Sequence, residues 1–214
     1  MAGDEPAPPT LRALIERIAA GDSAAALDAL GRAPDLGRAA AATGAERETA
    51  ADHFLSGIGR HIYAGDTALH LAAAAHQGMV VDRLIAMGAD LGARNRLGAA
   101  PLHSAVDAGP GFPAWDPAAQ SAVVTALLCA GADPNAADRN GATPLHRAVR
   151  NRCSGAVAAL LAGGADPQAT NTAGSTPHDL AHRDTGRGGA GSPEARAEQR
   201  AIQHLLGPPR TPQP

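Results

Sequence analysis

The stretch Gly141-Ala142-Thr143-Pro144-Leu145-His146-Arg147-Ala148 holds the pattern that decides how this chain folds. Its central part is Thr143-Pro144-Leu145-His146, and related versions stand at Thr67-Ala68-Leu69-His70, Ala100-Pro101-Leu102-His103 and Thr176-Pro177-His178-Asp179. The four copies start 33, 43 and 33 residues apart. A period near 33 residues indicates stacked repeats, and the longer interval indicates one repeat with about ten extra residues.

Each copy of the motif opens a pair of predicted helices. After Thr67 the apolar residues keep helical spacing as far as Leu84, and Gly88 then stands where a helix end favours a left-handed residue. Thr67 can cap the first helix of the pair. The same order returns at residues 123–133 and 156–166. Between the pairs, turn-forming residues predict hairpins, namely Asn95 with Gly98, Asp138 with Gly141, and Asn171 with Gly174.

In this order of hairpin, inner helix, loop and outer helix, residues 62–206 resemble the ankyrin-repeat family. The resemblance is specific because several spaced motifs agree in register. It implies an all-α repeat solenoid of about four helix-turn-helix repeats with short β-hairpin loops. It also implies a curved stack whose hairpin tips and inner helices form a concave, protein-binding surface.

The resemblance assigns the motif residues to the scaffold rather than to chemistry. In the family, the motif histidine hydrogen-bonds the threonine three residues earlier and the backbone of the next hairpin. Asp179 takes the place of this histidine in the last copy, and Ala100 lacks the threonine hydroxyl, so the second repeat is expected to be the weakest. The residues given this structural role are Thr67, His70, His103, Thr143, His146, Thr176 and Asp179.

The flanking segments are predicted to cap the stack. Residues 1–9 should be flexible, and residues 10–61 should form a degenerate N-terminal capping repeat with helices that open at Thr10 and Ser23. An inserted helix is predicted over about residues 46–58, because Ala51, Phe54, Leu55 and Ile58 recur at helical spacing. The last outer helix should be Ala195–Leu206, and residues 207–214, with four prolines, should form a disordered tail.

Composition narrows the classes of partner. The net charge of −3 gives no field that would attract nucleic acid or an anionic membrane, and no stretch approaches the apolar length of a membrane span. All 18 basic residues are arginine, which is typical of GC-rich bacterial genomes. We therefore expect a cytoplasmic monomer without a cofactor. Cys129 and Cys153 lie too far apart in the repeat for a disulfide, so both should be free thiols.

The concave surface is the first candidate for partner binding. By repeat position, Arg94, Arg96, Leu97, Arg139 and Asn140 should lie near the hairpin tips. Ser104, Asp107, Arg147 and Arg150 should lie on exposed faces of the inner helices. We interpret this partly basic groove as a site for an acidic protein segment. The alternative is that these arginines are simply solvated.

Two insertions give a second candidate. Residues 109–120 and 184–194 separate inner from outer helices in the second and fourth repeats. In this hypothesis Phe112 and Trp115 form an apolar anchor beside arginines, because Trp and Arg are frequent interface hot spots. The arginines of the cluster are Arg150, Arg152, Arg183 and Arg187. The alternative is that Trp115 folds back over the outer helices.

Catalysis is the least favoured class of function. His178 and His182 stand four residues apart, as in zinc helices, but the register places Asp179 at the motif position and makes a metal-dependent enzyme improbable. The segment Gly186–Ser192 lacks the lysine of a phosphate-binding loop. The sequence thus favours a non-catalytic protein-protein interaction module. A secreted effector acting on a host protein and a homo-oligomeric structural subunit remain alternatives.

Overall fold

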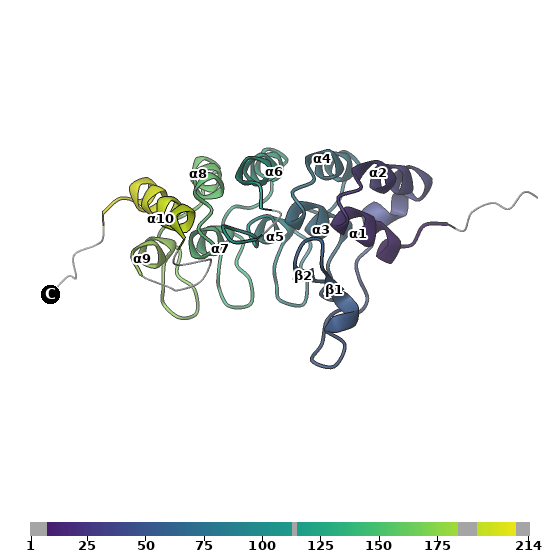
Figure 1. Ribbon diagram of the computed structural model, residues 1–214, viewed down its shortest axis with the longest axis horizontal. Coiled ribbons are helices and arrows are strands. Elements are labelled where there is room, and N and C mark those ends of the chain that lie inside the picture. The colour runs from purple at the N-terminus through teal and green to yellow at the C-terminus, as the bar shows by residue number, and fades with distance from the viewer. Residues whose placement is uncertain (1–7, 113–114, 184–191, 209–214) are drawn as a thin grey trace, which may run out of the picture.

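The computed structural model describes residues 8–112, 115–183 and 192–208, and within them the chain is a stack of paired helices (Figure 1). The inner helices are α1 (Leu11–Ala19), α3 (Ala68–Ala74), α5 (Pro101–Ser104), α7 (Pro144–Arg150) and α9 (Pro177–His182). The outer helices are α2 (Ser23–Arg32), α4 (Gly78–Ala86), α6 (Pro117–Cys129), α8 (Ser154–Ala162) and α10 (Pro193–Leu206). This arrangement confirms the predicted all-α repeat solenoid.

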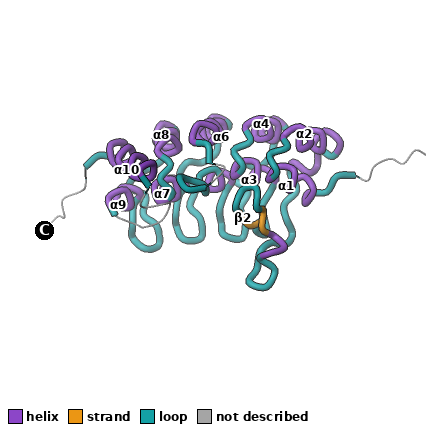
Figure 2. The backbone as a smooth tube through the Cα atoms, in the orientation of Figure 1, coloured by secondary structure: helices purple, strands orange, loops and turns teal. Residues whose placement is uncertain are grey.

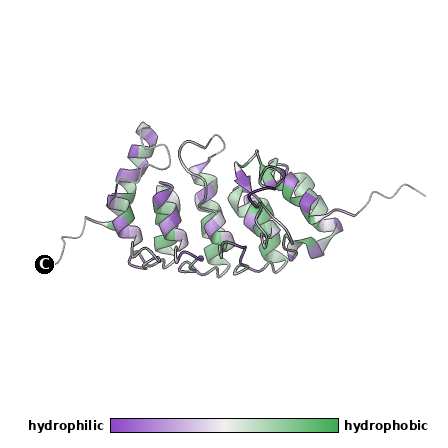
Figure 3. Ribbon diagram, turned by 90° about the horizontal axis from the view of Figure 1, so that it is seen from below, coloured by the Kyte–Doolittle hydropathy of each residue, from purple (hydrophilic) through white to green (hydrophobic). Residues whose placement is uncertain are grey.

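The core of the stack is thin and repeats along its length. The motif leucines Leu69, Leu102 and Leu145 are at most 1% exposed, and the outer helices contribute Leu84 and other fully buried residues. Several helices carry hydrophobic and hydrophilic residues side by side, and the buried residues of the helices pack within the stack (Figure 3). Stacked repeats of this kind need few aromatic residues, because each repeat buries its apolar face on its neighbours.

The hairpins between the pairs are joined to one another by backbone hydrogen bonds. The Arg96 N–H donates to the Ala64 carbonyl (2.7 Å), the Arg139 N–H to the Leu97 carbonyl (3.1 Å), and the Thr172 N–H to the Asn140 carbonyl (2.9 Å). Figure 2 shows these loops as a row on one side of the helices. A glycine is required in the first hairpin, since a Cβ on Gly98 would lie 2.8 Å from the Arg139 nitrogen.

The predicted helix over residues 46–58 is wrong. The segment instead forms a 3-10 turn at Ala51–His53 and an antiparallel pair of strands, β1 (Phe54–Leu55) and β2 (Arg60–His61), with Phe54 opposite His61. The turn between the strands lies against the end of α1, where a Cβ on Gly57 would lie 2.2 Å from the Ala19 carbonyl oxygen. Helical spacing of the apolar residues misled the prediction, because close packing at Gly57 demands a glycine turn.

The capping helices begin close to the predicted places. Thr10 caps α1 by accepting from the Ala13 N–H, and α2 begins at Ser23 with Asp22 as its capping residue. At the other end, the His182 and His178 rings donate to the carbonyls of Gly207 and Pro208, both at 3.0 Å. Most of the predicted flexible N-terminus and of the proline-rich tail lies outside the described residues.

The structure also shows the state of the two cysteines and the character of the helices. Cys129 is exposed, Cys153 is buried, and both are free thiols as predicted. Burial raises the pKa of the Cys153 thiol to about 12, so this thiol stays protonated and unreactive at neutral pH. No helix within the described residues has the length and apolar character needed to cross a membrane.

Candidate functional site

The motif histidines join each repeat to the next. The Nδ1 of His146 accepts from the Thr143 N–H (3.1 Å), and its Nε2 donates to the Ser175 carbonyl of the following hairpin (3.0 Å). His70 and His103 make the same pair of contacts, with Ala99 and Ala142 as the distant carbonyls. In the last copy, Asp179 accepts from the Thr176 N–H (3.1 Å) and so replaces the histidine.

These histidines are held in the neutral form. Burial lowers the pKa of His70 and of His146. Burial, aided by the nearby positive charge of Arg147, lowers the pKa of His103 to about 4. Because each Nδ1 accepts a backbone N–H, the proton resides on Nε2, and both ring nitrogens serve the scaffold.

The main hollow of the concave face lies between the strand pair β1–β2 and the inner helices. It has a volume of about 470 Å³. One wall comes from the inserted segment, with Ile58, Gly59, Arg60, His61 and Tyr63. The opposite wall and the floor come from the stack, with Ala74, Leu97, Asp107, Ala108, Phe112, Arg147, Arg150 and Asn151. The inserted segment therefore turns an open concave surface into a walled site.

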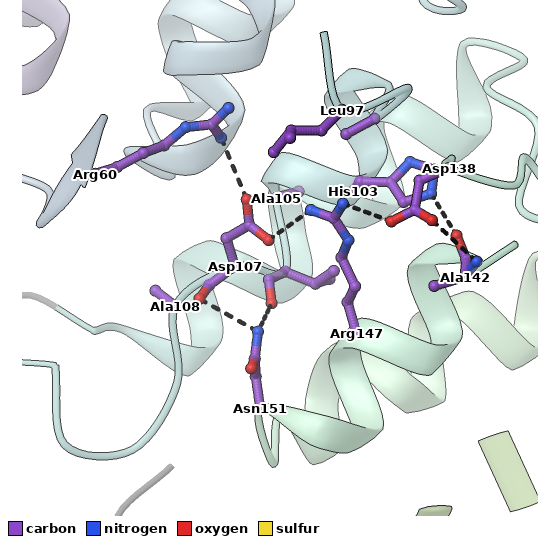
Figure 4. Close-up of polar contacts among 12 residues, drawn as sticks. Arg60, Leu97, His103, Ala105, Asp107, Ala108, Asp138, Ala142, Arg147 and Asn151 are labelled. Carbon is purple, nitrogen blue, oxygen red and sulfur yellow. Dashed lines mark hydrogen bonds and ion pairs between the residues drawn. The ribbon is translucent and has the colours of Figure 1, made fainter. Parts of the chain in front are cut away.

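A chain of ion pairs forms the floor of this hollow (Figure 4). Asp107 lies between two arginines, with Arg60 at 3.4 Å and Arg147 at 2.9 Å. Arg147 continues to Asp138 at 2.8 Å, and Arg60 continues to the fully buried Asp66 at 3.1 Å. The chain thus connects the inserted segment, the second repeat and the third repeat.

Burial and ion pairing shift the pKa values of Arg147 and Asp138 in opposite directions. Burial alone would lower the pKa of Arg147, but the carboxylates of Asp107 and Asp138 raise it. Burial alone would raise the pKa of Asp138, but its hydrogen bond from Arg147 helps to lower it. The pair Arg147–Asp138 is therefore charged at any ordinary pH, and each partner offsets the desolvation of the other.

Arg147 and Ser104 are not on exposed helix faces, which corrects the sequence prediction. Arg147 is 8% exposed and Ser104 is fully buried. Both positions lie on inner helices that pack against a neighbouring repeat. The Arg147 guanidinium also donates hydrogen bonds to the carboxylates of Asp107 and Asp138. Its contacts with Asp107 and Asp138 fix the floor of the hollow.

The inserted wall is the part of the site that the sequence reasoning missed. Asp66 offers a signal, since the residue before the other motif copies is Ala99, Ala142 or Ser175. A carboxylate at a buried repeat position requires a cation nearby. Here Arg60 supplies it, and Asp66 also accepts from Asn95 Nδ2 (2.9 Å) and from the Tyr63 N–H (2.8 Å).

The hairpin-tip arginines divide into two groups. Arg94 donates to the Gly98 and Ala137 carbonyls at 2.8 and 2.9 Å, so it ties two hairpins together. Arg96 donates to the Ala45 carbonyl and lies over the Tyr63 ring, 5.1 Å from its centre. Arg139 and Asn140, in contrast, are exposed at the next tip. Arg94 thus braces the hairpins, Arg96 braces the inserted segment, and Arg139 and Asn140 face solvent.

The predicted aromatic anchor lies at the edge of the same hollow. Phe112 is 43% exposed, and its ring lies close to Gly59, where an added Cβ would be 3.6 Å from the ring. Trp115 is partly buried, and its Nε1 donates to Gln120 Oε1 of α6 (3.0 Å). The loop that interrupts the second repeat therefore meets the turn between β1 and β2.

The predicted arginine cluster does not assemble as a whole beside Phe112. Arg150 lines the hollow together with Phe112. Arg152 is only 4% exposed, which corrects its assignment as a surface residue. Arg183 is exposed in the last repeat and donates to Ser175 Oγ (3.1 Å), and Arg187 lies outside the described residues.

His178 and His182 also have a structural explanation. Their rings are 5.0 Å apart, and both Nε2 atoms donate to carbonyls of the C-terminal segment. No group of three or more His, Cys, Asp or Glu side chains suited to a metal ion occurs among the described residues. The pair therefore fastens the chain after α10 to α9.

Comparison with family models agrees with the architecture. A model described as Ankyrin repeats (3 copies) matches residues 36–138, and one described as Ankyrin repeats (many copies) matches residues 127–181. The first match includes the inserted segment as well as the first regular hairpins. None of the curated proteins compared with the chain matches it.

Proposed function

This chain belongs to the ankyrin-repeat family, whose repeats generally serve as protein-protein interaction modules, and from that premise we propose that it binds an acidic segment of a partner protein in the concave hollow. The protein is a non-catalytic binder in this proposal. It acts as a cytoplasmic monomer and needs no cofactor.

The charge of the concave surface carries the proposal. The three segments that build it, residues 58–66, 94–107 and 137–151, contain six arginines and three aspartates, which gives a net charge of +3. The whole chain has a net charge of −3. All three aspartates are engaged by Arg60 or Arg147 in the floor. A partner segment with carboxylates would complement the excess of arginine.

The hollow is also built to lose little freedom on binding. Its floor is held by buried ion pairs, and its wall is braced by Arg96 and Tyr63. Preorganised surfaces bind more tightly, because fewer side chains have to be ordered in the complex. The residues proposed to contact the partner are Leu97, Phe112, Arg139, Asn140 and Arg150.

Peptide selection tests this proposal even though the partner protein is unidentified. Random peptides displayed on phage are selected on the full-length protein, and the enriched peptides are measured by fluorescence anisotropy at several salt concentrations. We expect acidic peptides whose affinity falls as salt rises. The double variant Arg139→Glu/Arg150→Glu should weaken them about tenfold or more, since each reversal places like charges together.

A charge-matched control separates the concave surface from the charge of the whole protein. Arg196 and Arg200 are exposed on α10, so the double variant Arg196→Glu/Arg200→Glu changes the net charge equally. This control should leave peptide affinity unchanged. Selected peptides that are neutral or basic, or equal losses in both double variants, would reject the proposal.

A further inference from the structure

We propose, on the basis of the proposed function, that the acidic partner segment carries one apolar side chain that enters a pocket between Phe112, Trp115 and the turn of β1–β2. This pocket has a volume of about 120 Å³. Its lining comes from the turn (Ser56, Gly57, Ile58, Gly59), the end of α3 (Ala74, Ala75, His76) and the second-repeat loop (Ala108, Phe112, Trp115). The inserted strand pair and the second-repeat loop thus line the same pocket.

The size of the pocket suits a single apolar group. An engineered cavity of about 150 Å³ with apolar walls binds benzene. The pocket here is slightly smaller, and two alanines of α3 keep its floor shallow and free of longer side chains. A leucine, isoleucine or phenylalanine side chain of a partner is the group of matching size. Trp115 and Phe112 supply the flat apolar walls that such a side chain contacts.

The side chains of Trp115, His76 and Gln120 at the pocket are already hydrogen-bonded within the protein. Trp115 Nε1 donates to Gln120 Oε1 (3.0 Å), and His76 Nε2 donates to the Ala105 carbonyl (3.0 Å). Gln120 Nε2 donates to the Ala105 and Ala108 carbonyls, both at 3.0 Å. Burial also lowers the pKa of His76, so this ring is neutral at pH 7. An apolar occupant therefore leaves none of these groups without a partner.

The pocket adjoins the basic hollow. Ile58, Gly59, Ala74, Ala108 and Phe112 line both. A segment that lies in the hollow with its carboxylates toward the arginines can therefore place a neighbouring side chain past Phe112. In a two-fold dimer this face would meet its own copy and set the +3 of the segments around the hollow against +3, so the charge favours an acidic peptide over a symmetric second copy. The partner is defined by this combination of carboxylates and one apolar residue.

A substitution that fills the pocket and leaves the hollow unchanged tests this proposal. Ala75 is partly exposed at the end of α3, and Ala75→Leu places a side chain into the space that the partner residue would occupy. A selected peptide with its apolar residue, and the same peptide with alanine there, are measured on both proteins. We expect Ala75→Leu to weaken the first peptide about tenfold and the second hardly at all. Phe112→Ala, which removes a wall, should act in the same direction.

Leu205→Ala is the matched control, because Leu205 on α10 is 41% exposed and Phe112 is 43% exposed. Thermal unfolding of each variant shows whether it folds. If Ala75→Leu misfolds, the difference between the two peptides on Phe112→Ala decides, because Phe112 also lines the hollow. Acidic peptides without a fixed apolar position, or equal losses for both peptides, overturn the pocket but leave the proposed function standing. Neutral or basic peptides reject the proposed function itself. A dimer in light scattering that Ala75→Leu dissociates overturns the inference in favour of a second copy.

Discussion

The second and third repeats build the same stacking contacts from inner helices of different length. The third repeat has seven residues in α7, whereas the second has only four in α5. His103 and His146 nevertheless make equivalent bonds to their neighbours, both to carbonyls at 3.0 Å. The second repeat lacks the threonine hydroxyl, because Ala100 stands where the third repeat has Thr143.

The two repeats differ most in the segment between the inner and the outer helix. In the second repeat, Gln120 reaches back from α6 to the carbonyls of Ala105 and Ala108 and replaces the missing helical turn. The chain between these points is free to present Phe112 and Trp115. The comparison shows that the hairpins and the motif histidines maintain stacking, so a shorter inner helix can be combined with a longer loop.

The largest effect is expected from removing the ion pair that ties the two repeats together. Arg147→Ala leaves Asp138, whose side chain is 5% exposed, without its cation, and Asp107 keeps only the longer contact with Arg60. Loss of one member of a buried pair costs about 3–5 kcal/mol. Urea unfolding should show a decrease of this size. The exposed Arg139→Ala is the control, with a change of less than about 0.5 kcal/mol; similar losses in both variants would contradict the structural role of Arg147.

Acid should weaken the second repeat more than the third. The pKa of His103 falls from 6.5 to about 4 in the folded protein, through burial and the charge of Arg147. Above pH 6.5 the histidine is neutral in both states and its contribution is fully present. As the pH falls from 6.5 toward 4, only the unfolded state takes up the proton, so about 3 kcal/mol of stability is lost.

Urea unfolding between pH 7.5 and 4 measures this loss. His103→Gln should be less stable than the natural protein at pH 7.5, since two hydrogen bonds are disturbed. Its stability should then decline less steeply as the pH falls. An unchanged pH dependence in His103→Gln would mean that the other buried histidines, His70, His76 and His146, account for the acid sensitivity.

The smallest change in stability is expected at the motif threonine position, which is Thr143 in the third repeat and Ala100 in the second. Thr143→Ala should cost about 1 kcal/mol, because the Thr143 hydroxyl caps α7 and lies 2.9 Å from His146 Nδ1. Ala100 has nearly the same backbone angles, so Ala100→Thr should add about 0.5–1 kcal/mol. Thermal unfolding decides both signs. Thr125→Ala, on the exposed face of α6, is the control, and a destabilised Ala100→Thr would show that the site has no room for the hydroxyl.

Local rules explain why the stack could be predicted and the inserted segment could not. The capping residue, the motif leucine and the motif histidine recur at fixed offsets, so the helices of one repeat predict those of the next. Residues 46–58 have no second copy to set their register, and apolar spacing alone favoured a helix where Gly57 packs against α1 in a turn. Arg147 was likewise placed on a surface, because the sequence does not show that Asp107 and Asp138 meet it from two different repeats.

The resemblance to the ankyrin-repeat family supplied the scaffold role of the motif histidines. The sequence by itself determined the repeat architecture and the position of the loop that carries Phe112 and Trp115. These follow from short-range patterns, since capping, helical spacing and hairpin turns act over a few residues. Only the tertiary structure decided that the strand pair β1–β2 meets this loop, and that their meeting encloses a hollow and a pocket. Such contacts bring residues 58–63 beside Asp107, Ala108, Phe112 and Trp115, and long-range packing of this kind leaves no periodic trace in the chain.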